Sequence, residues 1–337
     1  MGGGPQEESA GLVTGEAAAK ERYTSRFVLT MCVANLVGAL AHGIGIGLTL
    51  AEARTDIKMG FVKWVPVDIG NATHPMFERQ VKTVWHIYPT QIVVAWFALS
   101  FTFHLVIGGL LAARGVRSSA AGWYLRGLYK CRAWWRWGEY FFSASIMMLV
   151  AVRMLGQREL YAAWAVVGCM ATTQLFGWAT ELYSSSHIVT LSKDDPGVRT
   201  LCGYTLLRRW DPDPWVTVHR FSIHLGGYIP YFVSWYIVVD AYNTNMDAFG
   251  DYLPDFIPYM VWASLAVFTL FGLVQLWNQI YSFGPSLYWL GELIYVVLSF
   301  VAKAELGLLV LYQVLVPGSI YDDFLGIRNS TALADEA

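Results

Sequence analysis

Long apolar segments separated by shorter polar connections form the main pattern of this chain. Each of seven segments contains enough consecutive apolar residues to cross about 30 Å of hydrocarbon as a helix. They lie near residues 27–50, 90–113, 133–152, 160–183, 219–240, 258–282 and 287–316. The connection between the third and the fourth is very short and contains Arg153, Arg158 and Glu159. The pattern therefore predicts an all-α membrane protein built as a bundle of seven transmembrane helices.

Polar segments at the two ends and after the first helix complete the predicted organisation. Residues 1–25 are rich in Gly, Ala and Glu and lack the basic start, apolar core and cleavage site of a signal peptide. We therefore expect a flexible N-terminal tail (1–25), a seven-helix domain (26–317) and a C-terminal tail (318–337). The connection between the first two helices is long enough to hold structure of its own, and residues 62–67, with Pro66 near their end, predict a short strand there.

Basic residues in the connections predict the orientation of the bundle, because cytoplasmic loops are enriched in Lys and Arg. The N-terminal tail and the connections after helices two, four and six share one side, and they carry more Lys and Arg than the opposite side. The connection after helix five has no Lys or Arg. Four aspartates lie at its start or within it, namely Asp240, Asp247, Asp251 and Asp255. These patterns predict a cytoplasmic N-terminus, an extracellular C-terminus and a structured extracellular first loop. Glycosylation sequons at Asn71 and Asn329 lie on the predicted outer side.

The composition agrees with a membrane protein and argues against several other classes. Apolar residues make up 55% of the chain and charged residues 14%, whereas about a quarter of the residues in a soluble domain are charged. A net charge of −2 gives no basic surface for nucleic acid. The cysteines (Cys32, Cys131, Cys169 and Cys202) have no metal-ligand spacing. Because the chain also contains no nucleophile elbow and no His-Glu-x-x-His motif, an intramembrane enzyme is disfavoured.

Lys303 has the clearest chemical implication, because it lies in the middle of the last apolar segment. A charged side chain at the centre of a membrane helix costs about 2.5 kcal/mol or more, so it usually has a counter-charge or a chemical role. A buried lysine suits two such roles: pairing with a carboxylate, or condensing with a carbonyl to form a Schiff base. Ser299 and Glu292, one and three turns earlier, share its helix face, whereas Glu305 faces another neighbour.

Glu139, in the aromatic-rich third segment, has two possible cationic partners. Lys303 is one, because the third and seventh helices run in the same direction through the bundle. Arg136, one turn earlier in the same helix, is the other, and spacing alone leaves both pairings open. A lone histidine inside such a bundle is most simply a neutral, hydrogen-bonded core residue. The other polar residues expected within the bundle are His42, Ser100, His104 and Ser143, while Glu181 is expected at the membrane interface.

Two stretches of sequence resemble the heliorhodopsin family. Residues 291–303 (GELIYVVLSFVAK) are similar to helix 7 of that family. In that helix, the lysine that carries retinal directly follows an alanine, and a serine lies one turn earlier. Residues 136–145 (RWGEYFFSAS) are similar to its helix 3, where the Glu before Tyr is the Schiff-base counterion. The family's distinguishing topology has a cytoplasmic N-terminus, which the loop charges of this chain predict independently. The resemblance extends over all seven helices and is most specific in these two.

The resemblance implies roles for particular residues. Lys303 would form a protonated Schiff base with all-trans retinal, and Glu139 would be its counterion. The polar residues of the retinal pocket would be Ser299, Ser143, Ser100 and Gln275. A polar network toward the cytoplasmic side, able to take up a proton after retinal isomerises, would contain His42, His104 and Glu292.

The resemblance also implies how the protein works in the cell. We expect a plasma-membrane photoreceptor that senses or signals light without net ion pumping, and we expect no enzymatic activity. Its ligands would be retinal and the lipid bilayer. A homodimer and a cytoplasmic signalling partner of unknown identity are further expectations of the resemblance.

Two alternative functions remain open. The resemblance to heliorhodopsins implies no role for Glu305. This residue would either bind a polar group on a neighbouring helix or give a proton or cation a path outward, as in a light-gated channel. A G-protein-coupled-receptor-like ligand receptor is the second alternative, because Cys131 and Cys202 occupy the places of that class's external disulfide. It would require the opposite orientation, and the chain lacks an Asp-Arg-Tyr after helix three and an Asn-Pro-x-x-Tyr in helix seven.

Overall fold

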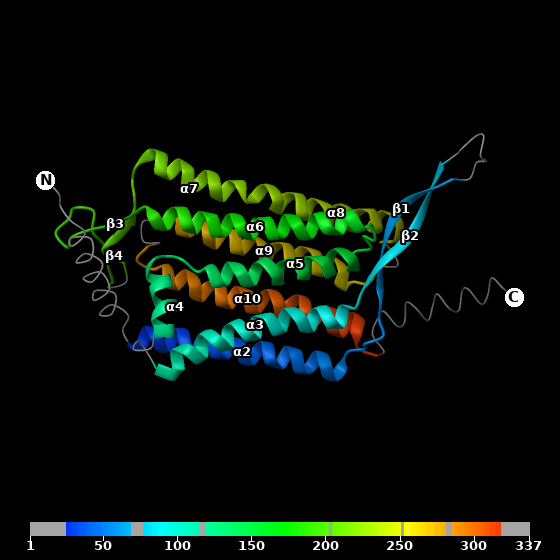
Figure 1. The fold of residues 1–337 in the computed structure, drawn as a ribbon, viewed down its shortest axis with the longest axis horizontal. Coiled ribbons are helices and arrows are strands. Elements are labelled where there is room, and N and C mark those ends of the chain that lie inside the picture. Colours follow the sequence, from blue (N-terminus) through cyan, green and yellow to red (C-terminus); the bar gives the residue numbers. More distant parts are fainter. Residues whose placement is uncertain are drawn as a thin grey trace.

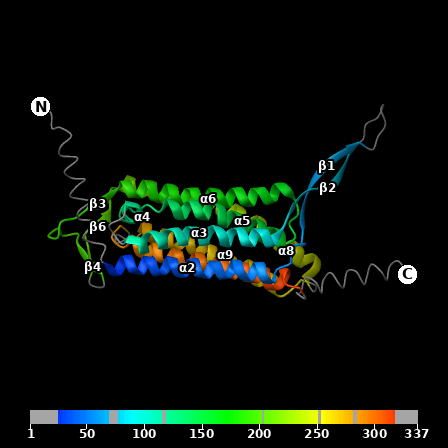
Figure 2. The same cartoon turned by 60° about the horizontal axis from the view of Figure 1, so that its bottom comes forward.

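The computed structural model of the protein describes residues 25–68, 77–114, 119–201, 204–250, 253–280 and 285–317. Long helices make up most of this part and lie side by side in a bundle (Figures 1 and 2). The predicted C-terminal tail, residues 1–24 of the predicted N-terminal tail, both glycosylation sequons and Cys202 lie outside the described residues.

Each predicted apolar segment lies in one helix or in two consecutive helices. Five of them correspond to single helices, namely α2 (Ser25–Glu52), α3 (Pro89–Arg114), α5 (Trp134–Met154), α6 (Leu160–Ser186) and α9 (Phe256–Ile280). The last corresponds to α10 (Tyr288–Val310), which continues into a short π-helix, η3 (Leu311–Leu315). Within the described ranges, five helices are long and apolar enough to cross a membrane: α2, α3, α6, α9 and α10 with η3.

The fifth predicted segment is not the single helix that we expected over residues 219–240. The chain instead forms α7 (Pro214–Gly226) and α8 (Tyr228–Phe249), which meet at Gly227. Pro230 lacks a backbone N–H, so it cannot donate the helical hydrogen bond to the carbonyl of Gly226, and the helix is interrupted there. A Cβ atom at Gly227 would lie 2.9 Å from Cβ of Phe176, so glycine allows α6 to pack closely against this junction.

A β-hairpin fills the connection between α2 and α3. It consists of the antiparallel strands β1 (Met59–Asp68) and β2 (Phe77–Ile87), and the strand predicted at residues 62–67 lies inside β1. At the base of the hairpin, Phe61 is fully buried and the N–H of Val62 donates to the carbonyl of Arg158 at 2.7 Å. These contacts attach the base to the connection between α5 and α6, while the rest of the hairpin projects beyond the bundle (Figure 1).

The opposite end of the bundle carries a short helix and small strand pairs (Figure 1). The helix α4 (Ser119–Tyr129) lies in the connection between α3 and α5, where the apolar pattern predicted no element. In the connection between α6 and α7, β3 (Ile188–Thr190) pairs with β6 (Arg208–Trp210), and β4 (Arg199–Leu201) pairs with β5 (Tyr204–Leu206).

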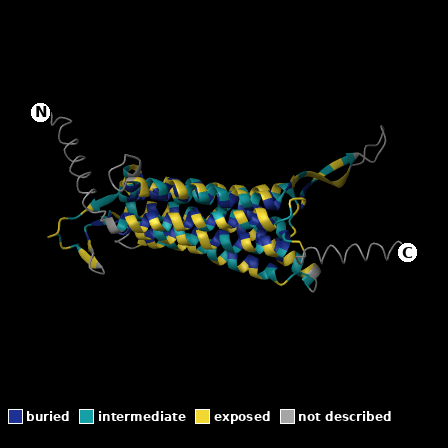
Figure 3. Ribbon diagram, turned by 90° about the horizontal axis from the view of Figure 1, so that it is seen from below, coloured by how far each residue is buried: buried dark blue, intermediate teal, exposed yellow. Residues whose placement is uncertain are grey.

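Burial in the bundle follows the pattern expected of a protein surrounded by lipid (Figure 3). The interior contains large side chains without solvent exposure, including Trp96 and Tyr295. The outward faces carry exposed apolar side chains, such as Leu40 on α2 and Phe232 on α8. Because contiguous apolar surface of this kind is unstable in water, the described bundle suits the interior of a membrane.

Candidate functional site

A buried ion pair joins α5 to α10. Nζ of Lys303 lies 3.0 Å from Oε1 of Glu139, and the two side chains are only 3% and 5% exposed. Nζ also donates a hydrogen bond to Oγ of Ser299 at 2.6 Å, as their spacing of one helical turn allows. Of the two partners that the sequence left open for Glu139, the structure therefore brings Lys303 to it.

The carboxylate of Glu139 is also held by α3. Oγ of Ser100 lies 2.6 Å from Oε1 of Glu139 and 3.1 Å from the carbonyl oxygen of Trp96. Because the carboxylate is charged and closer, the hydroxyl donates its one hydrogen to Glu139. The ring of Tyr140 lies 5.2 Å from Nζ of Lys303. A buried charge is tolerated when it is paired and hydrogen-bonded, and both charges of this pair have such partners.

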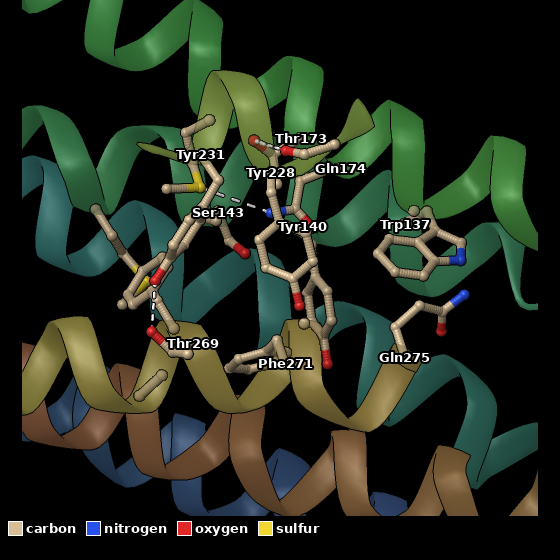
Figure 4. Close-up of a pocket in the computed structure, with 18 of the residues that line it drawn as sticks. Trp137, Tyr140, Ser143, Thr173, Gln174, Tyr228, Tyr231, Thr269, Phe271 and Gln275 are labelled. Carbon is tan, nitrogen blue, oxygen red and sulfur yellow. Dashed lines mark hydrogen bonds between the residues drawn. The ribbon is translucent and has the colours of Figure 1, made fainter. Parts of the chain in front are cut away.

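A cavity opens beside Lys303, between α10 and the helices α5 to α9 (Figure 4). Its walls are mainly aromatic and apolar, and they include Tyr140, Met147, Met170, Tyr228, Phe268 and Phe271. In Figure 4, Trp137 and Gln275 lie on the right side of the cavity, while Ser143, Tyr231 and Thr269 lie toward the left. Among the described residues, Nε2 of Gln275 and Oγ of Ser143 have no hydrogen-bond partner, so both remain available to a bound group.

Two glycines make room for the walls of this cavity. A Cβ atom at Gly177 would lie 2.2 Å from the ring of Trp137, and one at Gly272 would lie 2.7 Å from the hydroxyl of Tyr228. Any larger residue would push these aromatic side chains out of position. Neither glycine could be predicted from the sequence, because a glycine inside an apolar segment does not indicate which side chain will pack against it.

The two predicted histidines form a stacked pair near the ion pair. The rings of His42 and His104 lie 5.4 Å apart with an angle of 15° between their planes. Nδ1 of His104 lies 2.9 Å from Oδ1 of Asn35, a residue that the sequence analysis missed. Both ring nitrogens of His42 are buried and lack a hydrogen-bond partner within the described ranges. The structure therefore brings the two histidines together.

A second group of buried charges, which we call the ionic cluster, consists of Arg136, Glu181, Glu292 and Tyr288. The guanidinium of Arg136 forms ion pairs with both Glu181 and Glu292. The hydroxyl of Tyr288 donates to Oε1 of Glu181 at 2.6 Å. Nε1 of Trp135 donates to Oε1 of Glu292 at 3.1 Å. The cluster thus joins α5, α6 and α10 through one cation and two carboxylates.

In the ionic cluster, three residues have partners that the sequence pattern did not predict. Arg136 binds acids from two other helices instead of Glu139 in its own helix. Glu181, which was expected at the membrane interface, is 2% exposed and packs against Arg136 inside the bundle. Glu292 shares the face of Lys303 but is bound by Arg136 and Trp135, so it belongs to this cluster and not to the histidine pair.

Glu305 points away from the ion pair, as its position on α10 predicted. Its Oε2 accepts a hydrogen bond from Oγ of Ser264, on α9, at 3.2 Å. Its Oε1 is buried and has no hydrogen-bond partner in the described part of the chain. The expected contact with a polar group on a neighbouring helix is therefore present, and one oxygen remains unused.

Cys131 is a free thiol, which removes the external disulfide that a receptor of the G-protein-coupled class would have. Its Sγ donates to the carbonyl of Pro285 and accepts from Nη2 of Arg208, both at 3.6 Å. Burial raises the pKa of this thiol to about 11, so it is unreactive at neutral pH. No group of three or more His, Cys, Asp or Glu residues that would hold a metal occurs in the described ranges.

Comparison with known families adds one match. A family model described as heliorhodopsin matches residues 26–194 and 200–315, which include the ion pair, the cavity, the histidine pair and the ionic cluster. No curated protein matches the chain.

Proposed function

This chain belongs to the heliorhodopsin family, and on that premise we propose that Lys303 binds retinal covalently in the cavity beside it. Membership of the family implies a retinal-based, light-sensing function of the rhodopsin type. It also implies an integral membrane protein of the photoreceptor kind and not a typical enzyme. The observation that carries the proposal is the buried amine of Lys303, which lies at the wall of an aromatic cavity and is paired with Glu139.

The chemistry of the cavity suits a polyene aldehyde. Aromatic and apolar walls favour a hydrocarbon chain, and Lys303 is the amine that lines the cavity. In the condensation, Nζ of Lys303 forms a C=N bond with the aldehyde carbon. Two hydrogens of the ammonium leave with the carbonyl oxygen as water, and the third stays on nitrogen with the positive charge. Bound retinal would supply visible absorption and light-driven isomerisation.

Glu139 is the proposed counterion of that positive charge. It lies 3.0 Å from Nζ of Lys303, and the short contact with Ser100 holds its carboxylate in this position. Ser299, whose Oγ accepts a hydrogen bond from Nζ at 2.6 Å, also helps to hold the nitrogen in place. Ser143 and Gln275 line the cavity with polar atoms that have no partner in the described part of the chain, and they are the proposed polar contacts along the chromophore.

His42 and His104 are the proposed acceptors of a proton that leaves Nζ after illumination. Histidine suits this role because its ordinary pKa is near neutral. Each ring nitrogen of His42 lacks a partner among the described residues, and His104 is oriented by Asn35. A proton held inside the protein in this way returns to Nζ in the dark, which supports sensing or signalling without net pumping.

The proposed arrangement in the membrane has seven crossings. α5 forms the third and α7 with α8 forms the fifth, in addition to the five helices that are long and apolar enough by themselves. The distribution of Lys and Arg supports a cytoplasmic N-terminus and an extracellular β-hairpin. Location in the plasma membrane, a homodimer and a cytoplasmic signalling partner are proposed from family resemblance.

Light-gated conduction of protons or cations is a second candidate function, and one observation at Glu305 favours it. The Glu305 side chain is half-buried, and its buried Oε1 has no partner in the described ranges. This oxygen would give a proton a stopping point between α9 and α10. Patch-clamp recording under illumination, in the wild type and in Glu305→Gln, tests this function. A light-evoked current that the variant loses supports it, and no light-evoked current at any voltage removes it.

The proposal is tested by expressing the protein with all-trans retinal and recording its visible spectrum. We expect a coloured wild type and a colourless Lys303→Ala variant. Ser145→Ala is a suitable control, because the Ser145 hydroxyl donates to the Phe141 carbonyl of its own helix at 2.6 Å and does not line the cavity. This substitution should leave the colour unchanged. A colourless wild type, or a coloured Lys303→Ala, would refute covalent binding at Lys303.

A further inference from the structure

Tyr295, on α10, is hydrogen-bonded through its hydroxyl and its backbone to residues that line the cavity. Its hydroxyl lies 3.0 Å from Oε1 of Gln275, which lines the cavity, and 3.2 Å from the carbonyl of Phe271. Its own carbonyl accepts a hydrogen bond from the hydroxyl of Tyr140 at 3.0 Å. Because the ring of Tyr140 lies beside Lys303, a change around Nζ reaches Tyr295 through one intervening side chain.

The same side chain contacts the ionic cluster with its ring. The guanidinium carbon of Arg136 lies 4.0 Å from the centre of the Tyr295 ring, which is within the range of a cation–π interaction. Tyr295 is 1% exposed and Arg136 is 4% exposed, so the interaction is shielded from water. Tyr295 therefore contacts both the wall of the cavity, through Tyr140 and Gln275, and the ionic cluster, through Arg136.

The ionic cluster in turn holds the connection between α4 and α5. Oε2 of Glu181 accepts a hydrogen bond from the N–H of Ala133 at 3.1 Å, directly before α5 begins. Two residues earlier, Cys131 has a φ of 54°, in the left-handed region that non-glycine residues rarely adopt. The backbone turns sharply at this point, so the Ala133 amide depends on a side chain of another helix for its partner.

We propose that Tyr295 is a positioning residue that transmits a change in the cavity to the connection between α4 and α5. This inference rests on the proposed photoreceptor function and extends it by identifying the connection that responds to light. With the hydroxyl bonded to Gln275, the Tyr295 ring stays against Arg136. When that bond is lost, the ring withdraws, Arg136 and Glu181 shift together, and the amide of Ala133 loses its acceptor.

Residues of this cluster move together because two carboxylates share its one cation. Arg136 is shared between Glu181 and Glu292, and Nε of Arg136 has no partner in the described part of the chain. Leaving one carboxylate unpaired in the interior is costly, so the cluster has few intermediate arrangements. A displacement at Tyr295 is therefore passed on to Ala133 and not absorbed locally.

Hydrogen–deuterium exchange of the retinal-loaded protein, compared in the dark and in the light, tests the inference. In the wild type, we expect light to accelerate exchange in the segment 130–137, which contains the Ala133 amide, by about threefold. Tyr295→Phe removes the hydroxyl but keeps the ring, and it should reduce this acceleration by at least about half while the pigment still forms and responds to light.

Thr180→Val is the matched control, because the Thr180 hydroxyl is buried and donates to the Phe176 carbonyl of its own helix at 2.8 Å. It should leave the light-induced exchange unchanged. Full acceleration in Tyr295→Phe would overturn the inference, as would an absence of any light effect on this segment in a coloured wild type. A colourless wild type would instead refute the proposed function, so the two failures are distinguishable.

Discussion

The ion pair between Glu139 and Lys303 predicts strong energetic coupling, which a double-mutant cycle on the retinal-free protein would measure. At 3.0 Å and an effective dielectric constant of about 20, the attraction between two unit charges is about 5 kcal/mol. Removing one partner leaves the other charge buried and unpaired, so Glu139→Gln and Lys303→Met should each lower the free energy of unfolding by about 3–5 kcal/mol. The double variant contains no unpaired charge and should be more stable than either single variant.

The assay is reversible unfolding by sodium dodecyl sulfate in mixed micelles, followed by tryptophan fluorescence and extrapolated linearly to zero denaturant. Lys303→Met combined with Glu305→Gln is the control cycle, because Glu305 lies close in sequence but bonds to Ser264 on α9. In the control cycle, the losses in unfolding free energy caused by the two single substitutions should add up to the loss in the double variant. If the costs of Glu139→Gln and Lys303→Met also add within about 0.5 kcal/mol, the two residues are not paired and the reasoning is wrong.

Four further variants test separate parts of the account. In the retinal-loaded protein, Glu139→Gln should move the visible band to longer wavelength, because loss of the counter-charge lets the positive charge spread along the polyene; an unshifted band would contradict the counterion role. Ser100→Ala should cost about 1.5–3 kcal/mol in the micelle assay, since it removes a hydrogen bond to a charged carboxylate. Arg136→Met should cost about 3–5 kcal/mol in the same assay, because it leaves two buried carboxylates unpaired. Gly272→Val should lower the pigment yield without changing the circular dichroism, because its side chain would collide with Tyr228; a normal yield would mean that the cavity is not the binding site.

Much of the fold could be predicted from the sequence, because a helix in lipid must be long and apolar and leaves a clear pattern. Each of the seven apolar segments lies in one helix or in two consecutive helices. The pattern did not reveal the interruption at Gly227, since glycine and proline are tolerated inside membrane helices and do not always break them. It also missed α4, which is too short to cross a membrane and lies in a basic connection.

The candidate site was predictable where a residue has few chemical alternatives. Lys303 required a partner or a chemical role, and the direction of helices three and seven made Glu139 a possible partner. The roles of Arg136, Glu181 and Glu292 could not be predicted, because they depend on how three helices are rotated about their axes. Periodicity places a residue on a face of its own helix, but it does not identify the helix that this face contacts.

Covalent binding of retinal at Lys303 is the central claim, and mass spectrometry after borohydride reduction tests it most directly. Reduction converts the C=N bond of the loaded protein into a stable amine, so proteolysis yields a peptide that carries the chromophore. The account predicts that the added mass lies on the peptide containing Lys303 and is absent from Lys303→Ala. An adduct on another lysine, or none in a protein loaded with retinal, would contradict it.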